Sequence, residues 1–208
     1  MTGRKTEKEK FAGGDYTTTV EAYIPGTGRA IQGATSHNLG QNFGKAFDVT
    51  FQNAEGEREY VWQTSWGLST RMIGALIMTH SDDQGLVLPP KVAPVQVVIV
   101  PVFKPKDKES VMEAAEALFA ALKPHVRVKL DDRDNMRPGA KYFEWERKGV
   151  PMRLELGPRD LEQRAVMSKM RLAELDERGR PVKETLSWDG LGVEIGTRLD
   201  RFQEELYE

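Results

Sequence analysis

The chain has 208 residues, of which 39% are apolar and 30% are charged, and its formal net charge at pH 7 is −2. This balance is typical of a soluble globular protein and excludes a disordered chain. The length allows one large domain or two small ones, each with its own hydrophobic core.

Composition also excludes several kinds of functional site. The sequence has no cysteine, which excludes disulfides and thiolate metal sites, and its three histidines argue against a histidine-built metal cage. No apolar run approaches the ~20 residues that cross a bilayer, and the N-terminal segment lacks the apolar core of a signal peptide. We therefore expect a cytoplasmic protein that does not contact membranes. Because the net charge is close to zero, any RNA contact has to come from a local patch.

The first part of the chain has patterns typical of antiparallel β-sheet. Residues 15–24 alternate and are rich in β-branched and aromatic types, which predicts a strand, and a Pro-Gly-Thr-Gly turn separates it from a second strand that starts at Arg29. The runs 46–52 and 58–66, joined by a polar turn, predict a β-hairpin. Apolar residues at helical spacing over 69–80 predict a helix that packs on this sheet.

The sequence changes character near residue 90, where several prolines form a stiff connection and we place a domain boundary. Strands and helices then alternate, a pattern that predicts a parallel sheet. The predicted elements are a strand in VQVVIVPV, helices over 108–122 and 139–148, strands over 126–130 and 151–157, a helix from Leu161, and a final amphipathic segment from Val193. We expect an α+β domain over residues 1–90 and an α/β domain over residues 91–208, the latter with a five-stranded parallel or mixed sheet.

One segment, RAIQGATSHNLGQNF at 29–43, concentrates polar residues and glycines at the end of a strand. Thr35 and His37 share one strand face, Gln32 lies nearby, and Gly33 and Gly40 would allow a ligand to approach the backbone closely. From composition alone, a loop rich in turn residues explains this segment about equally well.

A second segment, QTSWGLSTRMIG at 63–74, places Arg71 at the start of a predicted helix. The helix dipole disfavours a cation there, so an anionic ligand such as a triphosphate would explain the arginine. A surface arginine paired with a nearby acid is the commoner use of this residue type, and it remains the alternative.

Together these segments resemble the prolyl-tRNA synthetase family. GRAIQGATSHNLGQNF is similar to the TSH-containing strand region of that family, and WGLSTRMIG resembles its motif 3. Downstream, the strings at 132–141 and 149–160 resemble the class IIa anticodon-binding domain. The resemblance covers nearly the whole chain. It implies the last part of a class II catalytic domain, with the motif 3 helix, joined to an anticodon-binding domain. Motifs 1 and 2 would lie upstream of Met1, and the chain alone would then not activate proline.

The resemblance also implies roles for individual residues. Arg71 would neutralise phosphate charge during catalysis, and the expected ATP contacts are Gln32, Thr35, Ser69 and Arg71. Gln32 would also help to hold Mg²⁺, while His37 and Gly67 would form part of the proline pocket. In the second domain, Glu146 and Arg159 would read anticodon bases and Tyr142 or Phe143 would stack on one of them.

For the intact enzyme, the implied function is ATP- and Mg²⁺-dependent ligation of proline to its tRNA by a homodimer. Two alternatives remain at this point. The chain could be a tRNA-binding module without catalysis, or it could belong to another class IIa synthetase, for threonine, glycine or histidine. The TSHNLGQNF string favours proline.

Overall fold

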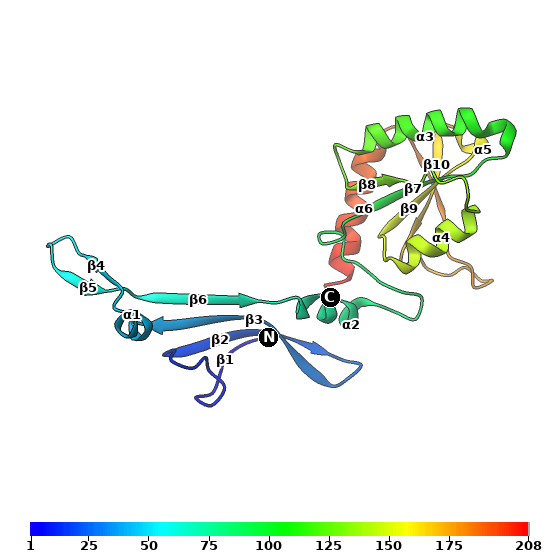
Figure 1. Cartoon of the computed structure of the whole chain (residues 1–208). Coiled ribbons are helices and arrows are strands. Elements are labelled where there is room, and N and C mark those ends of the chain that lie inside the picture. Colours follow the sequence, from blue (N-terminus) through cyan, green and yellow to red (C-terminus); the bar gives the residue numbers. More distant parts are fainter. Residues whose placement is uncertain (208) are drawn as a thin grey trace. The chain divides into compact units, whose positions relative to one another are not determined.

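A computed structural model describes residues 1–207 and divides the chain into two compact units, Met1–Thr79 and His80–Glu208 (Figure 1). The boundary that the sequence predicts near residue 90 lies inside the second unit. No helix in the described part of the chain is long and apolar enough to cross a membrane.

The first unit is built on a four-stranded antiparallel sheet (Figure 1). Its strands, in order across the sheet, are β1 (Thr2–Arg4), β2 (Tyr16–Ile24), β3 (Arg29–Gly40) and β6 (Gln63–Leu68). The predicted strands at 15–24 and from Arg29 are confirmed, and so is the helix over 69–80, which forms α2 (Arg71–His80).

The predicted hairpin over 46–66 is only partly correct. The short strands β4 (Thr50–Gln52) and β5 (Arg58–Tyr60) pair with each other, but β6 leaves the hairpin and joins β3 in the main sheet. A short helix, α1 (Asn42–Ala46), precedes the hairpin. Gly44 of this helix approaches Val61 so closely that a Cβ would meet its carbonyl oxygen at 2.8 Å.

The second unit contains a five-stranded mixed sheet, as the sequence predicts. Strand β7 (Val97–Pro101) pairs in parallel with its two neighbours, and the other strand pairings are antiparallel. The order across the sheet is β11 (Glu184–Ser187), β10 (Ala165–Met170), β9 (Met152–Leu156), β7 and β8 (Val128–Leu130). The helices are α3 (Lys108–Leu122), α4 (Pro138–Arg147), α5 (Pro158–Glu162) and α6 (Leu191–Glu205), with a 3-10 turn, η1 (Pro105–Asp107).

Helices cover both faces of this sheet (Figure 1). The strand β7 is therefore buried on both sides. On one face, Ile99 belongs to a core that includes Leu118 of α3 and Ile195 of α6. On the other face, Val98 packs with Trp145 of α4. This alternation within one apolar strand is typical of parallel sheets covered by helices on both faces.

The helix predicted from Leu161 is wrong beyond Glu162, where α5 ends and β10 follows. Arg164 takes up a left-handed backbone conformation with φ of 47°, which ends the helix. Strand β10 lies between two other strands, and it buries the polar residues Ser168 and Lys169. These polar residues hide the apolar pattern that would identify a buried strand.

Candidate functional site

Three of the predicted ATP and proline contacts lie on one face of the first sheet. Thr35 pairs across the strands with Gly67, and His37 pairs with Ser65. Residues two positions apart on a strand share a face, so Thr35 and His37 point to the same side. A Cβ added at Gly67 would meet Thr35 Oγ1 at 3.2 Å. The glycine therefore keeps the space beside the Thr35 hydroxyl open.

The imidazole of His37 is held by neighbours on several sides. Thr17 Oγ1 lies 2.8 Å from its Nδ1, and Thr35 Oγ1 lies 3.1 Å from its Nε2. The Phe11 ring lies against it with ring centroids 4.8 Å apart. These contacts fix the orientation of His37 without any contribution from a ligand.

Gln32 is already engaged by a cationic side chain. Lys5 Nζ donates to Gln32 Oε1 at 2.5 Å. An amide oxygen is a suitable Mg²⁺ ligand, but a metal ion at this oxygen would have to displace the ammonium group. Within residues 1–207, no group of three or more His, Cys, Asp or Glu side chains could hold a metal. Gln32 alone does not make a metal site, so its Mg²⁺ contact stays a prediction.

Arg71 begins α2 and its side chain is exposed. No carboxylate in the described part of the chain lies within ion-pair distance of it, so the alternative of an acid-paired surface arginine finds no support. Ser69 precedes the helix, and its carbonyl accepts the Met72 N–H at 3.1 Å. The guanidinium group is therefore free to meet an anion.

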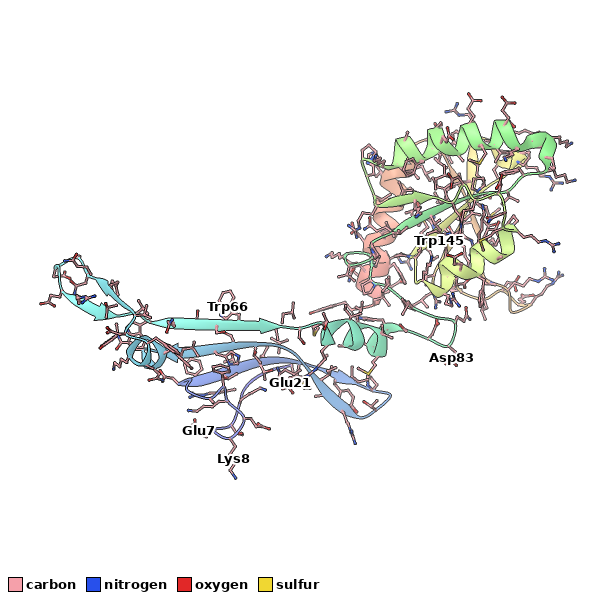
Figure 2. All side chains as sticks on the ribbon, in the orientation of Figure 1. Glu7, Lys8, Glu21, Trp66, Asp83 and Trp145 are labelled. Atoms are coloured by element: carbon pink, nitrogen blue, oxygen red, sulfur yellow. The ribbon has the colours of Figure 1, made fainter. Side chains whose placement is uncertain are left out.

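The opposite face of the first sheet is apolar and open. The residues Val20, Trp66 and Leu68 are exposed by 51%, 80% and 75%, and Trp66 points away from β6 (Figure 2). With Ala34 and Ser36 they line part of a hollow of about 440 Å³, which Thr35 and Gly67 also border. Large exposed apolar patches mark interaction surfaces or ligand-binding grooves.

The second unit has a cavity of about 610 Å³ at the carboxyl ends of the parallel strands β7 and β9. The chain segments that follow these strands, at 102–104 and 157–160, form much of its wall. Ligands of open α/β sheets bind at this edge. Two of the predicted anticodon contacts, Tyr142 and Arg159, line the cavity together, although they are far apart in the sequence.

Positive charge without a counter-ion faces this cavity. Lys183 is paired with Glu155 at 2.7 Å, and Asp160 accepts the Gly157 N–H at 2.8 Å. Other lining cations have no carboxylate within ion-pair distance in residues 1–207, namely Lys104, Lys106 and Arg159. The lining also includes the Asp107 carboxylate, so four cations face three carboxylates. This small excess of positive charge suits a ligand that carries negative charge, such as a nucleotide.

Tyr142 contributes an aromatic ring that is already contacted by cations. The guanidinium carbon of Arg153 lies 4.0 Å from the ring centroid, and Lys183 Nζ lies 5.4 Å from it. Burial and the nearby Glu155 carboxylate raise the pKa of the Tyr142 phenol above its usual range. Although burial raises it, the Lys183 and Arg153 side chains hold the pKa of Glu155 below its ordinary value.

The other two predicted anticodon contacts do not line the cavity. Phe143 is 64% exposed on α4, which leaves its ring free to stack. Glu146 is half-buried and pairs with Lys169 at 2.5 Å and with Arg153 at 3.7 Å. Because Arg153 also contacts Tyr142, it connects Glu146 with the cavity.

Two further charged residues near this cavity, Arg153 and Lys169, were not predicted from the sequence. Both are buried charged residues within strands, exposed by 8% and 6%. A charge in the middle of a buried strand is rarely tolerated unless it is paired. This pattern, in PMRLELG and in AVMSKM, is the signal that could have identified them.

A buried ion-pair cluster fixes α4, the helix that carries Tyr142, Phe143 and Glu146. The Asp131 carboxylate accepts hydrogen bonds from Arg133 at 2.6 Å and from Trp145 Nε1 at 2.7 Å, and Lys141 Nζ donates to its carbonyl oxygen at 2.9 Å. Although burial raises it, the hydrogen bonds from Arg133 and Trp145 hold the pKa of Asp131 far below its usual range. Lys141 and Trp145 belong to α4, so the cluster holds this helix against the end of β8.

Comparison with known proteins places both units in one family. Residues 96–198 match the family model described as an anticodon binding domain. The chain is 51% identical over 208 residues to the proline–tRNA ligase, cytoplasmic, of Arabidopsis thaliana, covering 99% of this chain and 38% of that protein. It is 50% identical to the proline–tRNA ligase of Roseiflexus sp., covering 99% of this chain and 42% of the relative. The chain belongs to the prolyl-tRNA synthetase family. It spans about two fifths of the length of these relatives.

As a member of the prolyl-tRNA synthetase family, the chain carries two groups of candidate residues in two separate units. The cavity at the ends of β7 and β9 falls within the stretch that matches the anticodon-binding model. The polar cluster around His37 lies outside that stretch, but the relatives align with it. The proline–tRNA ligase of Salinibacter ruber, for example, is 51% identical to this chain, and the alignment covers 100% of this chain.

Proposed function

We propose that the chain supplies two parts of a proline–tRNA ligase. The second unit reads the anticodon of a proline tRNA, and the first unit contributes contacts to ATP and proline. The observation that carries the proposal is the charged cavity at the carboxyl ends of β7 and β9, which lies within the stretch that matches the anticodon-binding model.

The side chains in this cavity and on the neighbouring part of α4 suit single-stranded RNA. Such recognition splays bases out of the stack, places them against aromatic rings and hydrogen-bonds their edges. Phe143 and Tyr142 offer rings, and Arg159 can donate to guanine O6 and N7. The Glu146 carboxylate retains acceptor capacity beyond its two cationic partners, and it can accept from guanine N1–H and N2–H₂. We therefore expect two adjacent guanines as the preferred bases.

RNA binding by the whole chain tests this part of the proposal. The probe is an anticodon stem-loop with guanines at the second and third anticodon positions, compared with one in which both are changed. Each lost contact should cost about 1–3 kcal/mol of discrimination. Arg159→Ala and Glu146→Gln should each reduce the preference for the guanines. Arg164→Ala, at a side chain that is 74% exposed, is the control. Equal affinity for both RNAs would show that the unit binds only the backbone.

The first unit is proposed to be the last part of a class II catalytic domain. Strand β6 is an edge strand, exposed over nearly its whole length, and it ends in the apolar Leu68. An edge of this kind normally pairs with another strand or is covered. Since relatives are more than twice as long as this chain, we propose that further strands of the same antiparallel sheet pair with β6 and cover Trp66.

In that complete domain, Arg71 is proposed to stabilise the phosphate charge of ATP while the proline carboxylate attacks. ATP would be held by Gln32, Thr35, Ser69 and Arg71, proline by His37 and Gly67, and Mg²⁺ would be bound mainly by phosphates and water. Partners of the intact enzyme are proposed to be a proline tRNA and a second copy of the enzyme.

Adenylate formation tests the role of Arg71. In a prolyl-tRNA synthetase that contains this chain, Arg71→Ala should lower proline-dependent ATP–pyrophosphate exchange by roughly 10²-fold or more, because it removes a preorganised charge from the transition state. Arg58→Ala, which changes an exposed arginine of the same unit, should leave the rate unchanged. An unaffected rate in Arg71→Ala would make this arginine a surface residue. The 208-residue protein alone should show no exchange.

A further inference from the structure

Thr17 is a buried polar residue that the proposed function leaves without a role. Its side chain is 0% exposed, and it lies on β2 directly opposite His37 on β3. Its hydroxyl contacts two groups, the backbone N–H of Phe11 at 3.0 Å and Nδ1 of His37 at 2.8 Å.

These contacts determine where the hydrogens lie. The Phe11 N–H can only donate, so Thr17 Oγ1 accepts this bond, and the Thr17 hydroxyl hydrogen needs an acceptor of its own. The only acceptor in contact with it in the described part of the chain is His37 Nδ1. A buried hydroxyl hydrogen without a partner is costly. Thr17 therefore donates to Nδ1, which has to be unprotonated.

The other ring nitrogen then carries the hydrogen. A neutral imidazole with unprotonated Nδ1 is protonated at Nε2, and Nε2 lies 3.1 Å from Thr35 Oγ1. His37 thus donates to Thr35. Thr35 Oγ1 cannot donate back to the same nitrogen, so its own hydroxyl hydrogen is left for another acceptor. Gly67, opposite Thr35, leaves room for one.

We infer that Thr17 is a positioning residue that fixes His37 in the Nε2–H tautomer, and that Thr35 consequently presents a hydroxyl donor to an anionic oxygen of a ligand. The identity of that ligand rests on the proposed function, in which the anionic oxygen belongs either to the proline carboxylate or to the phosphates of ATP. The tautomer itself does not depend on catalysis, so it can be tested even if the proposed function is wrong.

Nitrogen NMR of the 208-residue protein tests the inference directly. With ¹⁵N-labelled histidine, protonated and unprotonated ring nitrogens give well-separated signals, and a His37→Gln variant identifies the His37 pair among the three histidines. We expect Nδ1 unprotonated and Nε2 protonated in the unchanged protein at neutral pH. Protonated Nδ1, or protonation of both nitrogens, would overturn the inference without any variant.

Two hydroxyl deletions distinguish positioning from ordinary packing. Thr17→Val removes the donor to Nδ1 and should shift His37 toward the other tautomer, while Thr17→Ser should restore the original signals. Thr35→Val removes only an acceptor of Nε2–H, so the tautomer should stay and the Nε2–H should exchange faster with water. The inference fails if Thr17→Val leaves both nitrogen signals unchanged, or if Thr35→Val alone reverses the tautomer. Should Thr17→Val not fold, the tautomer of the unchanged protein decides.

Discussion

At the scale of single residues, the second unit depends on buried charges that compensate one another. Asp131 has a side chain that is 1% exposed and faces Arg133 and Lys141. Removing one member of such a cluster leaves the others buried without a partner, and this typically costs about 3–5 kcal/mol. The three binding candidates on α4 follow Lys141 in the same helix, namely Tyr142, Phe143 and Glu146. Their positions therefore depend on this cluster.

We predict that Asp131→Asn lowers the free energy of unfolding by about 3 kcal/mol, whereas Asp132→Asn at the exposed neighbour has little effect. Urea denaturation measures both. The pKa of Asp131 is lower in the folded protein than in the unfolded chain. The contribution of Asp131 to the free energy of unfolding is therefore fully present above the unfolded pKa of about 3.9, and it is lost as the pH falls toward the folded pKa. The difference between Asp131→Asn and the unchanged protein should therefore shrink below about pH 4. A difference that does not depend on pH in acid would contradict this assignment.

At the scale of elements, the sequence predicted best where burial follows a regular pattern. The helix over 108–122 was predicted with the bounds of α3, because its buried residues recur with helical spacing. The parallel pairing of β7 with β8 and β9 followed from the alternation of strands and helices. Strands β1 and β11 were not predicted, since their short, largely polar segments show no apolar alternation and are strands only because a neighbour pairs with them.

The candidate site was predictable only in part, because contacts that depend on pairing with another strand leave no local pattern in the sequence. Thr35, His37 and Gly67 share a face because β3 and β6 pair in one register. The polar strand segment predicted that Thr35 and His37 share a face, whereas only the family resemblance added Gly67. The tautomer-setting contact from Thr17 depends on pairing with another strand, which no local pattern reveals. In the second unit, Glu146 was predicted, but its partner Lys169 lies on a strand that the sequence indicated as helix.

At the scale of the whole molecule, the segment that leads into the second unit is part of that unit's packing. Arg171, with a side chain that is 2% exposed, donates to the Asp82 carboxylate at 2.6 Å and to the Leu86 carbonyl at 2.9 Å. The Arg171 hydrogen bond lowers the pKa of Asp82. Val87 is 1% exposed, and Gly149 lies so close to Leu86 that a Cβ would meet its carbonyl oxygen at 2.7 Å. The chain before residue 90 therefore contributes to the stability of the second unit.

We predict that a protein of residues 80–208 is more stable than one of residues 91–208 by about 3 kcal/mol or more. The shorter protein loses the buried Val87 side chain, worth about 1.5–3 kcal/mol, and leaves Arg171 buried without its carboxylate partner, which adds a cost of similar size. Both proteins should fold, because the core around Ile99 lies wholly within residues 91–208. Urea denaturation gives the difference in the free energy of unfolding, and a change in the midpoint without a change in slope would identify it as a change in stability.

Arg171→Met provides the matched test. It should destabilise the longer protein and should have little effect on the shorter one, since the shorter one has already lost Asp82 and Leu86. Equal effects of Arg171→Met in both proteins would show that the contacts of Arg171 with residues 82 and 86 contribute nothing to stability. Arg171 would then act only through the Glu146 carbonyl, to which it donates at 3.1 Å.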